Sequence, residues 1–262
     1  MVMNNCLQGV QHGAVRVLTL NRPEAMNALS SELARSLLEA VRSAEADQGT
    51  RAVVIAGAGN KAFSAGADLK ERRQMDAAQK WAQSRTLWNV NEAIWQSPKA
   101  FVAAVNGWCL GGGFELALYC DARVASDDAR FGFPEMALGA FPGAGGAVAL
   151  PRLIGRAAAA PFFYRGHRAT AAEALELGIV EQVTRPEETL AAAVAVAQTI
   201  VDSASPLGFA AVKRVLNEGP TLPFAQAVVL DQSQRQPLEA TKDYAEGMAA
   251  QAARRKPVFR GF

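Results

Sequence analysis

Two periodicities alternate along this chain, a short apolar one that favours strands and a longer amphipathic one that favours helices. Apolar residues recur at helical spacing over residues 30–46, where Ser30 is a suitable N-cap and Glu32 suits the first turn. Short apolar runs bounded by turn residues, which are typical of buried strands, occupy residues 15–20, 51–56, 101–105, 122–125 and 179–183. Strands therefore alternate with helices, and we expect an α/β fold.

Helical patterns dominate the rest of the chain. Thr170 and Glu173 form a capping-box pattern, and Gly178 is a suitable stop for the helix that they begin. Further helices are predicted over about 69–95, 114–120 and 186–203, and after residue 206 no strand pattern remains. We therefore expect a core domain over residues 1–200 and a helical C-terminal segment over residues 201–262.

Composition narrows the class of protein. The 262 residues carry 27 Lys and Arg against 25 Asp and Glu, a net charge of +2, and half of them are hydrophobic. These values are typical of a globular protein and give no electrostatic footprint for nucleic acid. Three cysteines and two histidines suit neither a disulfide framework nor a metal site. With no targeting signal and no apolar run of membrane-spanning length, we expect a cytoplasmic protein without a nucleic-acid or membrane partner.

The glycine-rich stretch 57–62 fits the G-x-G-x-x-G/A pattern of dinucleotide-binding loops. Residues 62–66 are predicted to continue as a loop instead of entering a helix, which argues against a dinucleotide-binding loop. Ser64 has only a faint resemblance to a nucleophile elbow, because Ala62 replaces the first glycine and neither histidine lies in a triad motif.

Two other loops are better candidates for chemistry. Residues 64–68 (SAGAD) and 110–115 (LGGGFE) each follow a strand and precede a helical stretch. Small residues let a ligand approach the backbone closely, and N–H groups at a helix start lack intrahelical acceptors. Two such groups that converge on one oxygen would form an oxyanion hole.

Glu115 and Glu135 are the candidate acid–base groups. Both acids stand among apolar residues, where partial burial would raise their pKa values and proximity would separate them. Each also has a simpler interpretation, since Glu115 could serve only the helix dipole and Glu135 could be a surface acid.

In these motifs the chain resembles the crotonase superfamily, the enoyl-CoA hydratases and isomerases. The resemblance extends over nearly the whole chain. It rests on NRP at 21–23, NAL at 27–29, AFSAGADLK at 62–70, AVNG at 104–107, GGGFELA at 111–117, FGFPE at 131–135, PGAGG at 142–146, and the tail at 246–248 and 255–259.

The resemblance implies a spiral of ββα turns with a helical C-terminal part that packs into a homotrimer or a dimer of trimers. It implies an acyl-CoA thioester substrate and no metal or redox cofactor, since coenzyme A belongs to the substrate. The amides of Ala67 and Gly112 would hold the thioester oxygen. The remaining substrate-binding residues that it implies are Ala65, Asp68, Leu69, Lys70, Gly111, and, reaching the CoA of a neighbouring subunit, Lys256 and Phe259.

Family hydratases carry glutamate at both matching acidic positions, whereas isomerases often keep only the second. The resemblance therefore predicts syn hydration of a trans-2-enoyl-CoA, in which Glu115 assists water addition at C3 and Glu135 protonates C2. Double-bond isomerisation is the nearest alternative, and a non-catalytic RNA-binding relative is a more distant one. One departure is Ala147-Val148-Ala149 where a typical hydratase has Thr-Gln-Arg. Bulky Trp108 and Phe114 could shape the acyl pocket or simply pack in the core.

Overall fold

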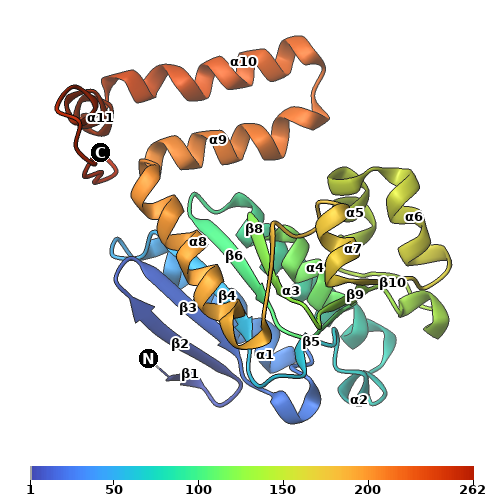
Figure 1. The fold of residues 1–262 in the computed structure, drawn as a ribbon. Helices are drawn as coiled ribbons and strands as arrows, with labels where there is room; N and C mark the ends of the chain where they lie inside the picture. Colours follow the sequence, from blue (N-terminus) through green and yellow to red (C-terminus); the bar gives the residue numbers. More distant parts are fainter. Residues whose placement is uncertain (1) are drawn as a thin grey trace.

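A seven-stranded sheet forms the centre of the computed structural model, which describes residues 2–262 (Figure 1). In spatial order its strands are β1 (Val2–Asn4), β2 (Leu7–His12), β3 (Val15–Leu20), β4 (Ala52–Gly57), β6 (Ala100–Val105), β8 (Ala122–Ser126) and β11 (Gln182–Thr184). The first three strands pair antiparallel, and every pair from β3 onward is parallel. A largely parallel sheet of this kind needs helices on both faces.

Both faces of this sheet are covered. Ile55 of β4 points to the face covered by α1 (Ser31–Ala46) and α3 (Ala77–Gln96), whereas its neighbour Val54 points to the face covered by α8 (Thr189–Ser203). Both side chains are fully buried. The continuous apolar run in this strand thus fills two separate cores, which explains why it shows no alternation of apolar and polar residues.

Two predicted helix starts are confirmed in atomic detail. Ser30 accepts a hydrogen bond from the amide of Leu33 at the start of α1. Thr170 and Glu173 form the reciprocal capping box at the start of α7 (Ala171–Glu176). These side chains satisfy amides that the helices themselves leave without acceptors.

A second sheet of short strands lies beside the first. In spatial order it contains β10 (Arg168–Thr170), β9 (Arg130–Gly132), β7 (Trp108–Leu110) and β5 (Ala62–Ser64). Along the chain, β4, β6 and β8 of the large sheet are followed by β5, β7 and β9 of the small one, and a helical stretch then leads back. The predicted ββα spiral is thereby confirmed.

The helix α4 (Gly112–Tyr119) packs against β5 and β7 of the small sheet and against α3 and α5, and it begins two residues earlier than predicted. Its carbonyl end is capped by Arg123, whose buried guanidinium donates hydrogen bonds to the carbonyl oxygens of Ala117, Cys120 and Ile179. A buried cation at this end compensates carbonyl groups that have no intrahelical donor.

The strand predicted at 179–183 is displaced in the structure. The amides of Ile179 and Val180 turn back to the carbonyl oxygen of Ala174 and so end α7, instead of joining a sheet. The strand β11 begins only at Gln182. The helix predicted from 186 starts as the 3₁₀-helix η3 (Pro186–Glu188) and continues as α8. The remaining short helices are η1 (Pro23–Ala25), α2 (Leu69–Arg72), η2 (Glu135–Leu138), α5 (Gly146–Ile154) and α6 (Arg156–Tyr164).

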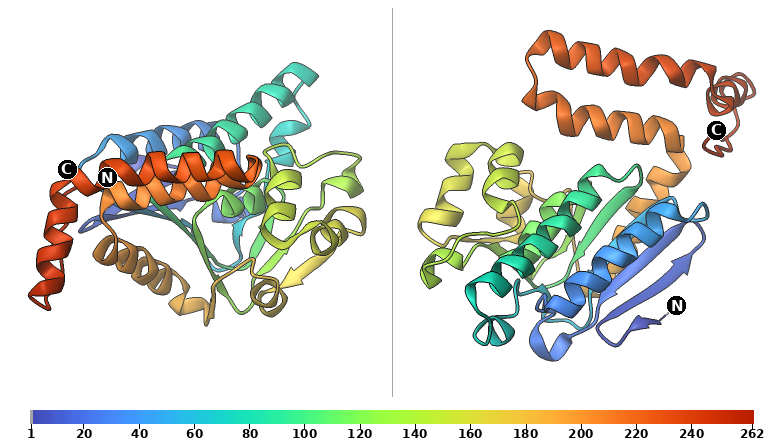
Figure 2. Two further views of the ribbon diagram at one scale, coloured as in Figure 1. Left: turned by 90° about the horizontal axis from the view of Figure 1, so that it is seen from above. Right: turned by 180° about the vertical axis from the view of Figure 1, so that it is seen from behind.

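Helices at the C-terminal end project from the core (Figures 1 and 2). They are α9 (Pro206–Glu218), η4 (Gly219–Thr221), α10 (Phe224–Arg235), η5 (Gln236–Ala240) and α11 (Lys242–Ala252). Lys213 anchors α9, because its buried ammonium group donates to the carbonyl oxygens of Ile94 and Lys99 and pairs with Asp121. No described helix is by itself long and apolar enough to span a membrane, and only the bent pair Pro186–Ser203 and Pro206–Thr221 meets that test together, by length and composition.

Candidate active site

Ala67 and Gly112 are brought together by neighbouring parallel strands. The loop with Ala67 follows β5, and Gly112 is the first residue of α4 directly after β7, which pairs with β5. A bridge to Leu29 fixes the first loop, since Leu29 donates to the carbonyl oxygen of Gly66 and accepts from the amide of Asp68. The N–H of Ala67 therefore points away from Leu29.

Neither amide has an acceptor in the part of the chain that the structure describes. The N–H of Gly112 is one of the groups that a helix start leaves open. The two amides are close neighbours, because a Cβ placed on Gly112 would lie 3.6 Å from the nitrogen of Ala67. A Cβ on Gly66, whose φ is +88°, would lie 3.0 Å from the nitrogen of Gly112. Glycine at position 66 thus keeps the two N–H groups accessible.

Glu115 lies three residues into α4 and is 2% exposed. Its Oε1 accepts two hydrogen bonds of 2.8 Å, from the amides of Ala144 and Gly146. Burial raises the pKa of this carboxyl group, and the two amides act in the opposite direction. The two hydrogen bonds thus fix Oε1 of Glu115 and leave Oε2 available to bind a ligand.

Glu135 begins the 3₁₀-helix η2, and its Oε2 is buried without a hydrogen-bond partner. Burial raises the pKa of Glu135 to about 7, and the nearby charge of Glu115 contributes to the increase. Gly111 lies against this carboxyl group, since a Cβ at that position would clash with Oε1 of Glu135. Position 135 thus combines a half-buried acid of raised pKa with a buried oxygen that lacks a partner, which is typical of functional sites.

These groups share a cavity of about 110 Å³. The residues that line it come from both glycine-containing loops, from α2, α3 and η2, and from the loop before α5. They are Ala65, Gly66, Ala67, Leu69, Arg72, Ser84, Leu87, Gly111, Gly112, Glu115, Pro134, Glu135, Leu138, Ala140, Phe141, Gly143 and Ala144. Among the described residues, no group of three or more His, Cys, Asp or Glu could hold a metal ion.

A family model described as enoyl-CoA hydratase/isomerase matches residues 11–261. The chain belongs to that family. It is 39% identical to the putative enoyl-CoA hydratase/isomerase YngF of Bacillus subtilis over 96% of each chain. It is 35% identical to the short-chain-enoyl-CoA hydratase of Clostridium acetobutylicum, over 98% of this chain and 97% of that one. The structure also matches the crystal structure of an enoyl-CoA hydratase from Bacillus anthracis, with a TM-score of 0.95, 34% identity and coverage of 98% and 100%.

Some residues that the family resemblance implies for substrate binding lie outside the cavity. Asp68 caps α2 and pairs with Arg22, at 2.9 Å. Lys70 is exposed on α2. Lys256 and Phe259 lie in the tail after α11, far from α2 in every view (Figures 1 and 2). Contact of these four residues with substrate remains a prediction.

Phe114 is a core residue of this structure. Its fully buried ring packs against Phe131, Phe133 and Phe162. Neither Phe114 nor Trp108 lines the cavity with the two glutamates.

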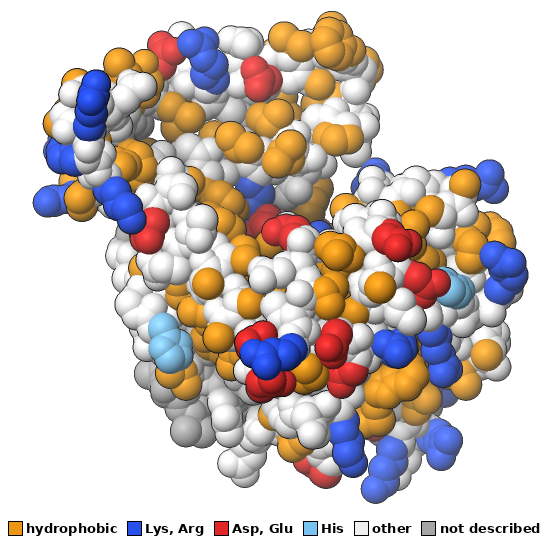
Figure 3. All heavy atoms as spheres, in the orientation of Figure 1, with side chains coloured by type: hydrophobic (Ala, Val, Ile, Leu, Met, Phe, Trp, Pro, Cys, Tyr) orange, Lys and Arg blue, Asp and Glu red, His pale blue; other side chains and the backbone are white. Residues whose placement is uncertain are grey.

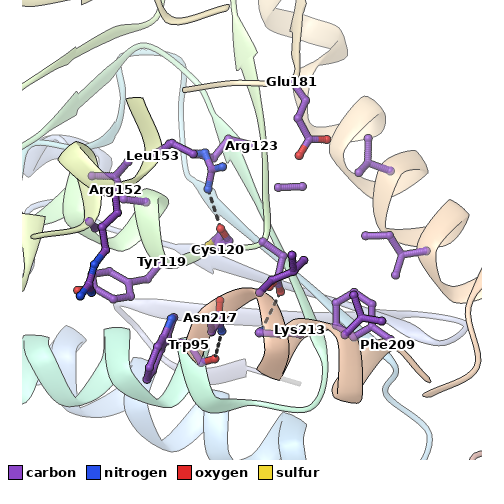
Figure 4. A pocket seen from close by; sticks show the side chains of 18 of the residues that line it. Trp95, Tyr119, Cys120, Arg123, Arg152, Leu153, Glu181, Phe209, Lys213 and Asn217 are labelled. Atoms are coloured by element: carbon purple, nitrogen blue, oxygen red, sulfur yellow. Dashed lines mark hydrogen bonds and ion pairs between the residues drawn. The ribbon is translucent and has the colours of Figure 1, made fainter. Parts of the chain in front are cut away.

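A larger cavity of about 1030 Å³ is lined by residues of α3, α4, α5, α8 and α9 (Figure 4). It contains Lys213, Arg123 and several apolar side chains, among them Phe209. Val148 and Ala149, where the typical family hydratase has polar residues, line this larger cavity. Because it contains neither glutamate and neither open amide, it is not the candidate active site.

The sequence reasoning did not anticipate the partners of Glu115 or the presence of Arg72 in the small cavity. The glycine-rich stretch 142–146 was the available signal for the first, but nothing in its composition indicates that its amides bind Glu115. Arg72 resembles any other charged residue in a helical stretch, and only the fold places it in the cavity.

Proposed function

We propose that this protein is an enoyl-CoA hydratase, which adds water reversibly and syn across the C2–C3 double bond of a trans-2-enoyl-CoA. The observation that carries the proposal is that two amides without acceptors among the described residues lie in one cavity with two glutamates, one buried and one half-buried, in different environments. The names of its relatives, which include a short-chain-enoyl-CoA hydratase, support the same reaction.

The amides of Ala67 and Gly112 bind the thioester oxygen in this proposal. When water adds at C3, negative charge moves through the double bond to that oxygen and forms an enolate. Each aligned donor is worth about 2.7–4 kcal/mol to such a transition state. Backbone dipoles provide this stabilisation, so the proposed reaction uses no cofactor beyond the coenzyme A of the substrate.

The two glutamates divide the proton transfers. The carboxylate of Glu115, held through Oε1, accepts a proton from water as its oxygen forms the bond to C3. Glu135, protonated near neutral pH, gives its proton to C2 as the enolate collapses. One proton is taken up and one is released, so the pair keeps its net charge, and dehydration follows the reverse path.

Isomerisation of the double bond is the second candidate, since Glu135 alone could move a proton between carbons. The two hydrogen bonds that hold Glu115 favour hydration, because a group that only lines the cavity would not need a fixed orientation. Proton exchange at C2 without addition at C3 would instead identify an isomerase.

The decisive experiment follows the loss of absorbance of the conjugated thioester across a panel of trans-2-enoyl-CoAs. We expect hydration of at least one short or medium chain, with the 3-hydroxyacyl-CoA identified by mass spectrometry. Failure to hydrate every member of the panel would overturn the proposal.

We further propose that the protein assembles as a homotrimer or a dimer of trimers. Hydrophobic side chains gather on the projecting helices above the hollow that separates them from the core (Figure 3). On these helices, Val212 and Leu216 of α9 and Phe224 of α10 are 58%, 68% and 85% exposed. Burial of such a surface by another copy would remove it from water, and in such an assembly we expect the tail with Lys256 and Phe259 to reach a neighbouring active site. Light scattering after gel filtration tests the assembly, and a monomer would contradict it.

A further inference from the structure

Arg72, the last residue of α2, lines the same small cavity as Glu115 and Glu135. Its Nη1 donates to two neutral oxygens on α3, Oε1 of Gln83 at 3.2 Å and Oγ of Ser84 at 3.4 Å. Arg72 thus brings a positive charge to the wall of a cavity in which the proposed substrate places its acyl chain.

The guanidinium group of Arg72 has no anionic partner among the described residues. The acids next to it in sequence are already engaged. Asp68 pairs with Arg22, and Oε2 of Glu71 accepts from the amide of Ser31 and from Nε2 of Gln83. Nε and Nη2 of Arg72 therefore present N–H groups that no residue in the described part of the chain accepts.

Arg72 forms no ion pair with Glu115 or Glu135, although all three residues line the cavity. Apolar side chains of Leu87, Leu138 and Phe141 line the same cavity. The cavity thus combines reacting groups, apolar walls and a distinct cationic site.

We propose that Arg72 selects acyl groups that carry a carboxylate at the end opposite the thioester, so that the preferred substrate is a dicarboxylic 2-enoyl-CoA. The inference rests on the proposed hydratase function. A planar guanidinium binds a carboxylate through two parallel hydrogen bonds, a geometry that a simple alkyl chain cannot use. A hydrogen bond to a charged group is worth about 1.5–3 kcal/mol, which corresponds to roughly a tenfold to hundredfold preference.

The test compares kcat/KM for trans-2-hexenoyl-CoA and trans-2-hexenedioyl-CoA, which differ only in the terminal carboxylate. We expect the native protein to favour the dicarboxylic substrate at least tenfold. Arg72→Met should remove that preference by lowering kcat/KM for the dicarboxylic substrate at least tenfold more than for the alkyl substrate. Arg72→Lys should keep part of the preference, because it retains the charge but loses the planar fork. Arg73→Met is the matched control, since it removes the same charge from the next, exposed residue.

Four distinct outcomes would contradict the inference or the function on which it rests. An unchanged preference in Arg72→Met would mean that Arg72 only joins α2 to α3 through Gln83 and Ser84. An equal rise in KM for both substrates would assign Arg72 to a phosphate of coenzyme A. Failure to hydrate both substrates while other enoyl-CoAs of the panel are hydrated would refute the dicarboxylic preference, whereas failure of the whole panel would contradict the hydratase function itself. Calorimetry with the unreactive pair hexanoyl-CoA and adipoyl-CoA then measures recognition without turnover, and equal affinities would again refute the role of Arg72.

Discussion

Glu115 and Glu135 line one cavity, yet their surroundings differ in the number of hydrogen-bond donors. Glu115 is almost completely buried but receives two amide hydrogen bonds on one oxygen. Glu135 has a buried oxygen without a partner, and its pKa is raised to about 7. The difference supports the proposed division of the two proton transfers between Glu115 and Glu135. Donors favour the charged form, whereas burial without donors favours the neutral form.

The energetic scale of this asymmetry follows from the pKa. A rise from 4.5 to about 7 for Glu135 corresponds to about 3 kcal/mol between its two protonation states. This free-energy cost falls on one residue only. A pKa near 7 is the value that a proton donor needs at neutral pH. The following predictions test whether the two carboxyl groups differ in this way.

The largest effect is expected from replacing the carboxyl groups themselves. Glu115→Gln and Glu135→Gln should each lower kcat by about a thousandfold, because neither amide can exchange a proton with the substrate. Hydration assays with circular dichroism to verify folding provide the measurement. Glu45→Gln, at an exposed position on α1, is the control and should retain full activity. Near-full activity in Glu115→Gln would leave the hydratase mechanism without its base.

The next effect tests the position of Glu135. Gly111 has φ of +50°, and a Cβ there would displace the carboxyl group of Glu135. Gly111→Ala should lower kcat by about a hundredfold, since misplacement by about 1 Å has that cost. Gly13→Ala is the matched control, because Gly13 has φ of +56° and open space around it. Equal activity of both variants would refute the tight contact with Glu135.

The pH dependence of activity and of stability tests the raised pKa of Glu135. If Glu135 must be protonated to donate to C2, kcat/KM for hydration should fall about tenfold per pH unit above pH 7. The folded-state pKa exceeds the unfolded value, so ionisation of Glu135 should also decrease the free energy of unfolding as pH rises from 4.5 to 7. Glu135→Gln should show a smaller decrease than the native protein in urea titrations. Identical pH profiles for both proteins would assign the raised pKa to another group.

The smallest effect concerns the loop that holds Glu115. The buried side chain of Asn91 donates a 2.8 Å hydrogen bond to the carbonyl oxygen of Ala144, whose amide binds Glu115. Asn91→Leu should lower kcat by about fivefold, the equivalent of about 1 kcal/mol, and should leave KM unchanged. Asn217→Leu removes a hydrogen bond of the same length to the carbonyl oxygen of Trp95 and should leave kcat unchanged. A similar loss of kcat in both variants would indicate a general effect on the fold.

The long elements of the fold could be predicted from the sequence because local patterns determine them. The apolar run in β4 and the cap at Ser30 indicate their structures directly. The three-residue strands β7, β9 and β10 are too short for a periodicity to be visible. Ile179 and Val180 have β-branched side chains that favour strands, but their amides donate hydrogen bonds to the carbonyl oxygen of Ala174 at the end of the preceding helix. Tertiary contacts overrode local preference at that position.

The candidate site was predictable in its residue types and not in its contacts. Glycine at positions 111 and 112 and the acids at 115 and 135 belong to the motifs that indicate the family. The hydrogen bonds from Ala144 and Gly146 to Glu115 join segments about 30 residues apart, and no local pattern encodes them. The same is true of Arg72, because its role depends on which side chains face the cavity after folding.

The buried cap at the carbonyl end of α4 has an electrostatic consequence for the opposite end of the helix. Arg123 offsets the partial negative pole, so the helix presents an unbalanced positive potential at Gly112. The charge of Arg123 would therefore help to stabilise a developing enolate at Gly112 without contacting it. Reaction rates would then depend on a residue that lies outside the substrate cavity and faces the other side of the core.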